Sequence, residues 1–192
     1  MARTLIVPGL NGSDEGHWQW WWLRDQPGAR LVEQEDWARP DAGRWLAALE
    51  AAVRASPGAI VVGHSLGTIL TARLADSPVA SMVAGAILVA PADIERTSRL
   101  HARTYDFGTI PRERLPFPSI LVASRDDIYM SFRQAVDIGT AWGSEIVDLG
   151  YAGHVNPASG YGRWMEGYRL VPRLAGAGRP LPVNHYWYDR HS

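Results

Sequence analysis

Six short apolar runs, each bounded by turn-forming residues, set the strongest limit on how this chain can fold. The runs are residues 4–7, 29–32, 59–62, 86–90, 119–123 and 145–149. Most of them lack polar alternation, which is typical of strands covered on both faces. The helix-like segments between them are residues 17–25, 41–55, 66–76, 130–142 and 161–174. Strands that alternate with helices predict an α/β protein with a doubly wound parallel sheet.

The alternation occupies most of the chain. The sequence has 192 residues, which favours one domain with a substantial core. We expect an α/β domain over residues 1–174 and a Gly- and Pro-broken tail over residues 175–192. Residues 91–118, an Arg-rich stretch bounded by prolines, interrupt the alternation but are too few for a helical cap domain.

Composition excludes several classes of function. A formal net charge of −1 gives no basic field for nucleic acid, and the longest apolar stretch is far too short for a membrane helix. The chain has no cysteine, which removes disulfides, thiolate metal sites and cysteine nucleophiles. We expect a cytoplasmic protein with no nucleic-acid or membrane partner.

The third run ends in the motif GHSLG, residues 63–67. Gly-x-Ser-x-Gly holds a serine hydroxyl at the tip of a sharp turn between a strand and a helix, where glycines give the clearance that the turn needs. In that interpretation Ser65 is a nucleophile and the Leu66 amide is one oxyanion donor. The alternative is an ordinary turn in which Ser65 caps the helix.

A serine nucleophile needs a base and an acid. Of the six histidines, only His154 lies in a loop directly after a predicted strand. Asp126 and Asp127 follow the fifth run, where a surface acid is the alternative for at least one of them. Serine, aspartate and histidine, each at the carboxyl end of a strand, stand in the order of the α/β hydrolases.

The loop after the first run supplies the second oxyanion donor in this interpretation. Gly9 and Gly12 leave the Leu10 and Asn11 amides uncovered, and the ligand crevice of a doubly wound sheet forms where the strand order reverses. A phosphate-binding loop is disfavoured, because the glycine spacing and the neighbouring acids do not suit an anion.

Trp18 begins a tryptophan-rich helix, HWQWWWLRD. Trp18, Trp21 and Trp22 share one face of it, and packing against the sheet is their favoured role. Because the helix starts beside the oxyanion loop, we also expect Trp18 and Asn11 to contact substrate.

Four segments together resemble a known family. VPGLNGSDEGHW, VVGHSLGT, ASRDDIYM and GHVNPASGYGRWMEG are similar to the small α/β-hydrolase-fold serine hydrolases of the retinoblastoma-binding-protein type, of which this chain looks like a bacterial member. The resemblance implies carboxylic ester hydrolysis with Ser65, Asp127 and His154 as the catalytic triad. Ile128 and Met165 stand where relatives often have proline.

These observations predict an enzyme that hydrolyses small carboxylic esters through an acyl-enzyme. Its sheet has six parallel strands in the order 2-1-3-4-5-6, helices cover both faces, and the amides of Leu10 and Leu66 form the oxyanion hole. No cofactor or metal is expected, and a protein partner is not indicated. The alternatives are an amidase or thioesterase with the same triad, or a protein-binding module on a hydrolase scaffold.

Overall fold

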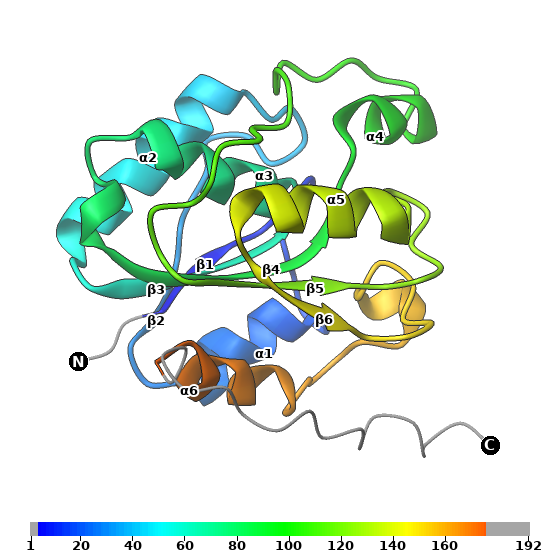
Figure 1. Cartoon of the computed structure of the whole chain (residues 1–192). Helices are drawn as coiled ribbons and strands as arrows, with labels where there is room; N and C mark the ends of the chain where they lie inside the picture. Colours follow the sequence, from blue (N-terminus) through cyan, green and yellow to red (C-terminus); the bar gives the residue numbers. More distant parts are fainter. Residues whose placement is uncertain (1–3, 176–192) are drawn as a thin grey trace.

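The computed structural model describes residues 4–175, and these form a sheet with helices on both faces (Figure 1). The strands are β1 (Thr4–Val7), β2 (Ala29–Leu31), β3 (Ala59–Ser65), β4 (Val83–Pro91), β5 (Ser119–Ala123) and β6 (Glu145–Asp148). All neighbours are parallel and the order is β2-β1-β3-β4-β5-β6, so the predicted fold and strand order are confirmed. The predicted tail lies outside the described residues except for Ala175, and the boundary at residue 174 stays a prediction.

The helices are α1 (Trp18–Asp25), α2 (Ala42–Ala55), α3 (Leu66–Ala72), α4 (Ile94–Leu100), α5 (Phe132–Trp142) and α6 (Leu170–Ala175). Four of the helices lie within predicted segments, namely α1, α2, α3 and α5. Local chemistry fixes their ends: the Asp41 carboxylate accepts from the Arg44 amide at the start of α2, and Ser131 and Gln134 form a capping box on α5.

Two segments differ from the prediction. Residues 91–118 contain α4, whose start is capped by the Asp93 carboxylate bound to the Arg96 amide. The segment predicted as one helix over residues 161–174 is a loop, a short 3-10 helix (Gly167–Arg169) and then α6. Glycines at 162 and 167 break the apolar periodicity there, since glycine disfavours a helix interior.

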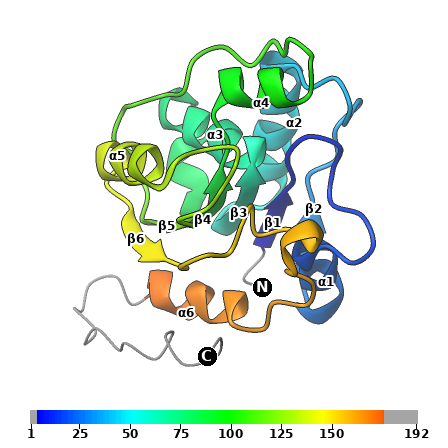
Figure 2. The ribbon, with the colours of Figure 1, turned by 90° about the vertical axis from the view of Figure 1, so that its right-hand side faces the viewer.

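The sheet separates two apolar cores, because side chains alternate between its faces. Leu5 of β1 packs in the core with α2, α3 and α5, whereas Ile6 faces the core with α1 and α6. Figures 1 and 2 show these two groups of helices on opposite sides of the sheet. Burial on both faces explains why the strands carry apolar residues at successive positions.

Parallel strands bring all their carboxyl ends to one edge of the sheet. The loops that follow β1, β3, β5 and β6 therefore meet there, and the order reverses between β1 and β3. This edge carries the residues singled out in the sequence. Within residues 4–175, none of the helices is both long and apolar enough to cross a bilayer.

Candidate active site

Ser65 lies on a strained turn between β3 and α3. Its backbone has φ 56° and ψ −123°, a conformation that costs energy for a residue with a side chain. A Cβ at Gly63 would lie 2.7 Å from the Gly67 carbonyl oxygen, and one at Gly67 would lie 2.1 Å from that of Val7. Only glycine fits at both positions, which is the arrangement expected of a nucleophile elbow.

The structure brings the three predicted catalytic residues into one chain of hydrogen bonds. His154 Nε2 lies 2.9 Å from Ser65 Oγ, and His154 Nδ1 lies 2.8 Å from Asp127 Oδ2. The three residues are buried, each with 7 or 8% of its surface exposed. Serine, histidine and carboxylate are thus in contact in the order required for base-assisted attack.

The partners of His154 determine where its proton resides. A carboxylate only accepts hydrogen bonds, so the neutral imidazole carries its hydrogen on Nδ1 and donates it to Asp127. Nε2 is then left as the acceptor for the Ser65 hydroxyl. Asp127 is held in turn, because its Oδ1 accepts a hydrogen bond of 2.8 Å from the Tyr129 amide.

Asp126 has a different role from its neighbour. Its Oδ1 accepts from the Gly153 amide and from the Ser124 hydroxyl, both at 2.8 Å. Burial raises its pKa, but these hydrogen bonds outweigh that effect and the net shift is downward. Asp126 is exposed, as the alternative of a surface acid predicted, and it also binds the loop that carries His154. Ser124 binds the same loop through the Ala152 amide at 3.0 Å.

The loop after β1 lies directly against the elbow. A Cβ at Gly9 would be 2.7 Å from Ser65 Cβ, so the chain passes as close as glycine allows. The Leu10 amide makes no hydrogen bond with any described residue, and the Leu66 amide opens α3, where helical amides have no partner within the helix. The Asn11 amide differs from the expectation, since it donates to the Trp37 carbonyl at 2.8 Å.

Two further histidines, which sequence reasoning did not place in the site, lie beside the three predicted residues. His64 Nε2 donates to the His154 carbonyl at 2.9 Å, and the His17 ring lies 4.8 Å from the His64 ring. Burial holds the pKa of His64 well below its usual value and lowers that of His17 to about 4. Both rings are therefore neutral near pH 7.

Trp18 does not line the site in the way expected of a substrate contact. Its side chain is fully buried in the core that α1 and α6 form on one face of the sheet, where its ring packs against Trp22 and Trp164. Its indole N–H donates to the Val155 carbonyl at 2.8 Å. Core packing, the favoured alternative, is what the structure shows, together with a contact to the residue that follows His154.

A cavity of about 200 Å³ opens over Ser65. It is lined by Gly9, Leu10, Asn11, Gly12, His17, His64, Ser65, Thr97, His101, Tyr129, His154, Asn156 and Pro157. Asn11 thus lines the cavity, and its contact with substrate stays a prediction. Thr97 and His101 come from α4 and its C-terminal end, so the segment that interrupts the strand–helix alternation forms part of the site.

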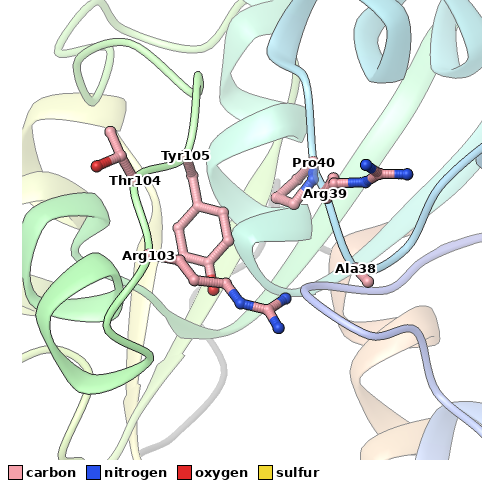
Figure 3. A pocket seen from close by; sticks show the side chains of 6 residues that line it. All are labelled: Ala38, Arg39, Pro40, Arg103, Thr104 and Tyr105. Atoms are coloured by element: carbon pink, nitrogen blue, oxygen red, sulfur yellow. The ribbon is translucent and has the colours of Figure 1, made fainter.

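A larger hollow of about 590 Å³ lies between residues 38–40 and 103–105. Figure 3 shows Arg103 beside Tyr105 and Arg39 extending away from them. This hollow is larger than the cavity over Ser65, but none of the three predicted catalytic residues lines it. We therefore assign it no part in the reaction. Nor do three or more potential metal ligands cluster anywhere within the described chain.

Comparison with known proteins assigns the family. A family model described as serine hydrolase matches residues 4–173. The chain belongs to the serine hydrolase family. This confirms the predicted small α/β-hydrolase-fold enzyme, and the chain is a hydrolase.

Solved structures of similar proteins extend over nearly the whole of this serine hydrolase. A protein described as a YdeN-like hydrolase, from Pectobacterium atrosepticum, is 32% identical with a TM-score of 0.81, and 94% of each chain is covered. The ydeN gene product of B. subtilis is 18% identical with a TM-score of 0.76, over 92% of this chain and 100% of that one.

A more distant likeness is to an esterase from Thermogutta terrifontis. It is 18% identical with a TM-score of 0.64, and the match covers 95% of this chain and 86% of that one. At this identity the likeness concerns the fold alone. Among curated proteins, none matches the chain.

Proposed function

We propose that this hydrolase cleaves small carboxylic esters through a covalent intermediate on Ser65. The observation that carries the proposal is the continuous hydrogen-bonded chain from Ser65 Oγ through His154 to Asp127, with Ser65 on a strained elbow. Strain of this kind persists where the surrounding structure holds it in place, and it clusters at active sites.

In the first half of the reaction, Ser65 Oγ attacks the ester carbonyl carbon while His154 Nε2 takes the hydroxyl proton. The tetrahedral intermediate carries its negative charge on the former carbonyl oxygen, which the Leu10 and Leu66 amides bind. When the intermediate collapses, the bond to the alcohol oxygen breaks and His154 gives that oxygen its proton. Asp127 keeps Nδ1 protonated and stabilises the imidazolium.

In the second half, water replaces the alcohol. His154 takes a proton from the water as its oxygen attacks the acyl carbon, and Ser65 leaves with the proton returned to Oγ. The products are one alcohol and one carboxylic acid. No group beyond the chain's own residues and water enters either step.

The size of the cavity supports small substrates. Its volume of about 200 Å³ lies below the range of roughly 300–1,000 Å³ typical of sites for drug-sized ligands. Short acyl groups are therefore proposed, and amides and thioesters remain alternatives because the same residues would attack them. A cytoplasmic location likewise stays a prediction, which rests on the lack of cysteine.

Steady-state hydrolysis of a panel of acetyl to dodecanoyl esters, with matched thioesters and amides, tests the proposal. We expect kcat/KM to be highest for short esters and to vanish in Ser65→Ala. Ser131→Ala is a matched control, because this serine caps α5 without lining the cavity, so it should alter stability but not turnover. Equal activity in wild type and Ser65→Ala would overturn the proposal.

A further inference from the structure

His17 stands at the start of α1 with one ring nitrogen already in use. Its Nδ1 accepts a hydrogen bond of 3.1 Å from the backbone amide of Gln19, which makes His17 the N-cap of the helix. A nitrogen that accepts an N–H cannot carry a hydrogen itself. The neutral imidazole therefore has its hydrogen on Nε2.

The ring is neutral as well as fixed in its tautomer. The pKa of His17 is lowered to about 4, mainly by burial; Asp14 opposes this shift and His154 contributes to it. At neutral pH, Nε2–H is thus an uncharged hydrogen-bond donor on a side chain that helix capping holds in place.

That donor is unused and accessible. Nε2 has no hydrogen-bond partner among the described residues. Within residues 4–175, two side-chain nitrogens lack a partner and are also closed off from solvent, and His17 Nε2 is not one of them. Those two belong to Trp22 and Arg73. Because His17 lines the cavity over Ser65, its free N–H is available to a molecule bound there.

The walls of the cavity suit an uncharged polar molecule. Most of the lining side chains carry hydrogen-bonding groups, and none of the lining residues is Lys, Arg, Asp or Glu. Leu10 and Pro157 are the apolar exceptions. Some of these groups bind one another, but the His17 Nε2–H has no partner among the described residues, and a hydrocarbon chain would leave it unpaired, which disfavours its binding.

His17, His64 and His154 all line the cavity. The His64 ring lies 4.8 Å from the His17 ring and 4.9 Å from the His154 ring. In the proposed reaction His154 passes a proton to the departing alcohol oxygen, so the alcohol half of the ester is on the histidine side.

We propose that His17 is a specificity-determining residue, whose Nε2–H donates a hydrogen bond to an oxygen atom in the alcohol half of the ester. The preferred substrates are then small esters of uncharged alcohols that carry a further hydroxyl, ether or carbonyl oxygen. This inference rests on the proposed function and adds the class of leaving group to it.

Two esters of nearly equal shape test the inference, 2-methoxyethyl acetate and n-butyl acetate, which differ by one oxygen in place of a methylene. Each kcat/KM is divided by the rate constant of alkaline hydrolysis of the same ester, to remove the difference in intrinsic reactivity. We expect wild type to prefer the methoxyethyl ester by roughly threefold to tenfold, the effect of one net hydrogen bond.

His17→Asn separates this contact from the structural role of the residue. Asparagine caps helices well, so α1 should keep its first turn, while the shorter side chain withdraws the donor from the cavity. We expect the normalised preference to fall to within about twofold of unity. Asp41→Asn is the matched control, because Asp41 is likewise the N-cap of a helix, α2, but does not line the cavity, and it should leave the preference unchanged.

A readout independent of turnover is the ¹⁵N NMR spectrum of the His17 ring. We expect Nε2 to be protonated, Nδ1 to be unprotonated, and neither to titrate between pH 5.5 and 8. A ring that titrates near the ordinary histidine value would overturn the inference.

The kinetic outcomes separate this inference from the proposed function. If wild type hydrolyses both acetates with equal normalised rates, the role of His17 is overturned while the esterase stands. If His17→Asn instead alters the preference for ethyl methoxyacetate over ethyl butanoate, the contact is with the acyl half and the inference is equally overturned. Absence of ester hydrolysis altogether would overturn the proposed function, and the inference with it.

Discussion

The nucleophile elbow and the loop that carries His154 meet at the same edge of the sheet, but they are held in different ways. Close packing fixes the elbow, residues 63–67, because neighbouring backbone leaves no room for a Cβ at Gly63 or Gly67. Hydrogen bonds from distant side chains fix the histidine loop, residues 149–157: Asp126, Ser124, His64 and Trp18 all bind its backbone.

This difference shows how the two residues that we propose to react, Ser65 and His154, are positioned. Ser65 is placed mainly by residues adjacent to it in sequence, and by the strand beside it. His154 is placed by residues that are 27 to 137 positions away from the backbone groups they bind. Filling the elbow should therefore disrupt the fold as a whole, whereas removing single contacts of the loop should weaken it stepwise.

The largest expected effect lies at the contact between the loop and its acid. Asp127→Asn keeps the shape of the side chain but removes the charge that fixes Nδ1–H and stabilises the imidazolium. The equivalent change in a different triad hydrolase lowers kcat by about 10⁴, and we expect a loss of that order in ester turnover. Asp126→Asn is the matched control: its oxygen can still accept from the Gly153 amide, so the loss should stay below about tenfold. A greater loss at Asp126 would move the acid to that residue.

Gly67→Ala tests the elbow by filling it. The added Cβ would lie 2.1 Å from the Val7 carbonyl oxygen, a backbone atom that cannot move without shifting β1. We expect the free energy of unfolding to fall by at least about 3 kcal/mol, measured by urea denaturation. In Gly43→Ala, within α2, the nearest atom is 3.5 Å away, and the change should stabilise by up to about 1 kcal/mol. Equal stability of the two variants would contradict a sterically fixed elbow.

Acid should weaken the histidine side of the site before it affects the elbow. The pKa of His17 is lowered from 6.5 to about 4 in the folded chain, so between these values the unfolded chain binds more protons. The free energy of unfolding therefore decreases as pH falls from 6.5 towards 4, and His17 contributes on the order of 3 kcal/mol to that decrease. His17→Asn removes this proton linkage, and its melting temperature should depend less steeply on pH in this window. Identical pH dependence in both proteins would show that His17 does not resist protonation.

The smallest expected effect concerns one indole hydrogen bond to the histidine loop. Trp18→Phe removes the bond from Trp18 to the Val155 carbonyl and should lower the free energy of unfolding by about 1 kcal/mol beyond the loss of packing. Trp22→Phe is the control, because Trp22 is equally buried and lies on the same helix. The indole nitrogen of Trp22 has no partner among the described residues. Trp18→Phe should therefore unfold at a lower denaturant concentration than Trp22→Phe. Equal midpoints would show that the Trp18 hydrogen bond does not stabilise the loop.

The same contrast explains how much could be predicted from the sequence. Strand order and the position of Ser65 follow from local patterns: apolar runs, turn residues and the two glycines of the elbow. The expected loops after β5 and β6 follow too, because parallel strands place their carboxyl ends together. The choice of Asp127 over Asp126 needed the resemblance, and the hydrogen bond of 2.8 Å to His154 agrees with it.

Contacts between distant segments could not be predicted in this way. No spacing in the sequence indicates that Asp126 binds the Gly153 amide or that His17 caps a helix, and histidine is not a residue commonly found at that position. Trp18 was open to both a core and a substrate role, because helical periodicity shows which residues share a face but not what that face contacts. The short helix α4 was missed because the prolines around it favoured an irregular segment.

The most direct test of the account is the reaction of the protein with a fluorophosphonate, followed by intact-mass measurement and peptide mapping. The phosphorus forms a bond to an activated serine oxygen as fluoride leaves, so only a nucleophile with a working base reacts quickly. We predict one adduct per chain, on Ser65, absent in Ser65→Ala and formed far more slowly in His154→Ala. An adduct on another serine, or labelling that persists in Ser65→Ala, would contradict the assignment of Ser65 as the nucleophile.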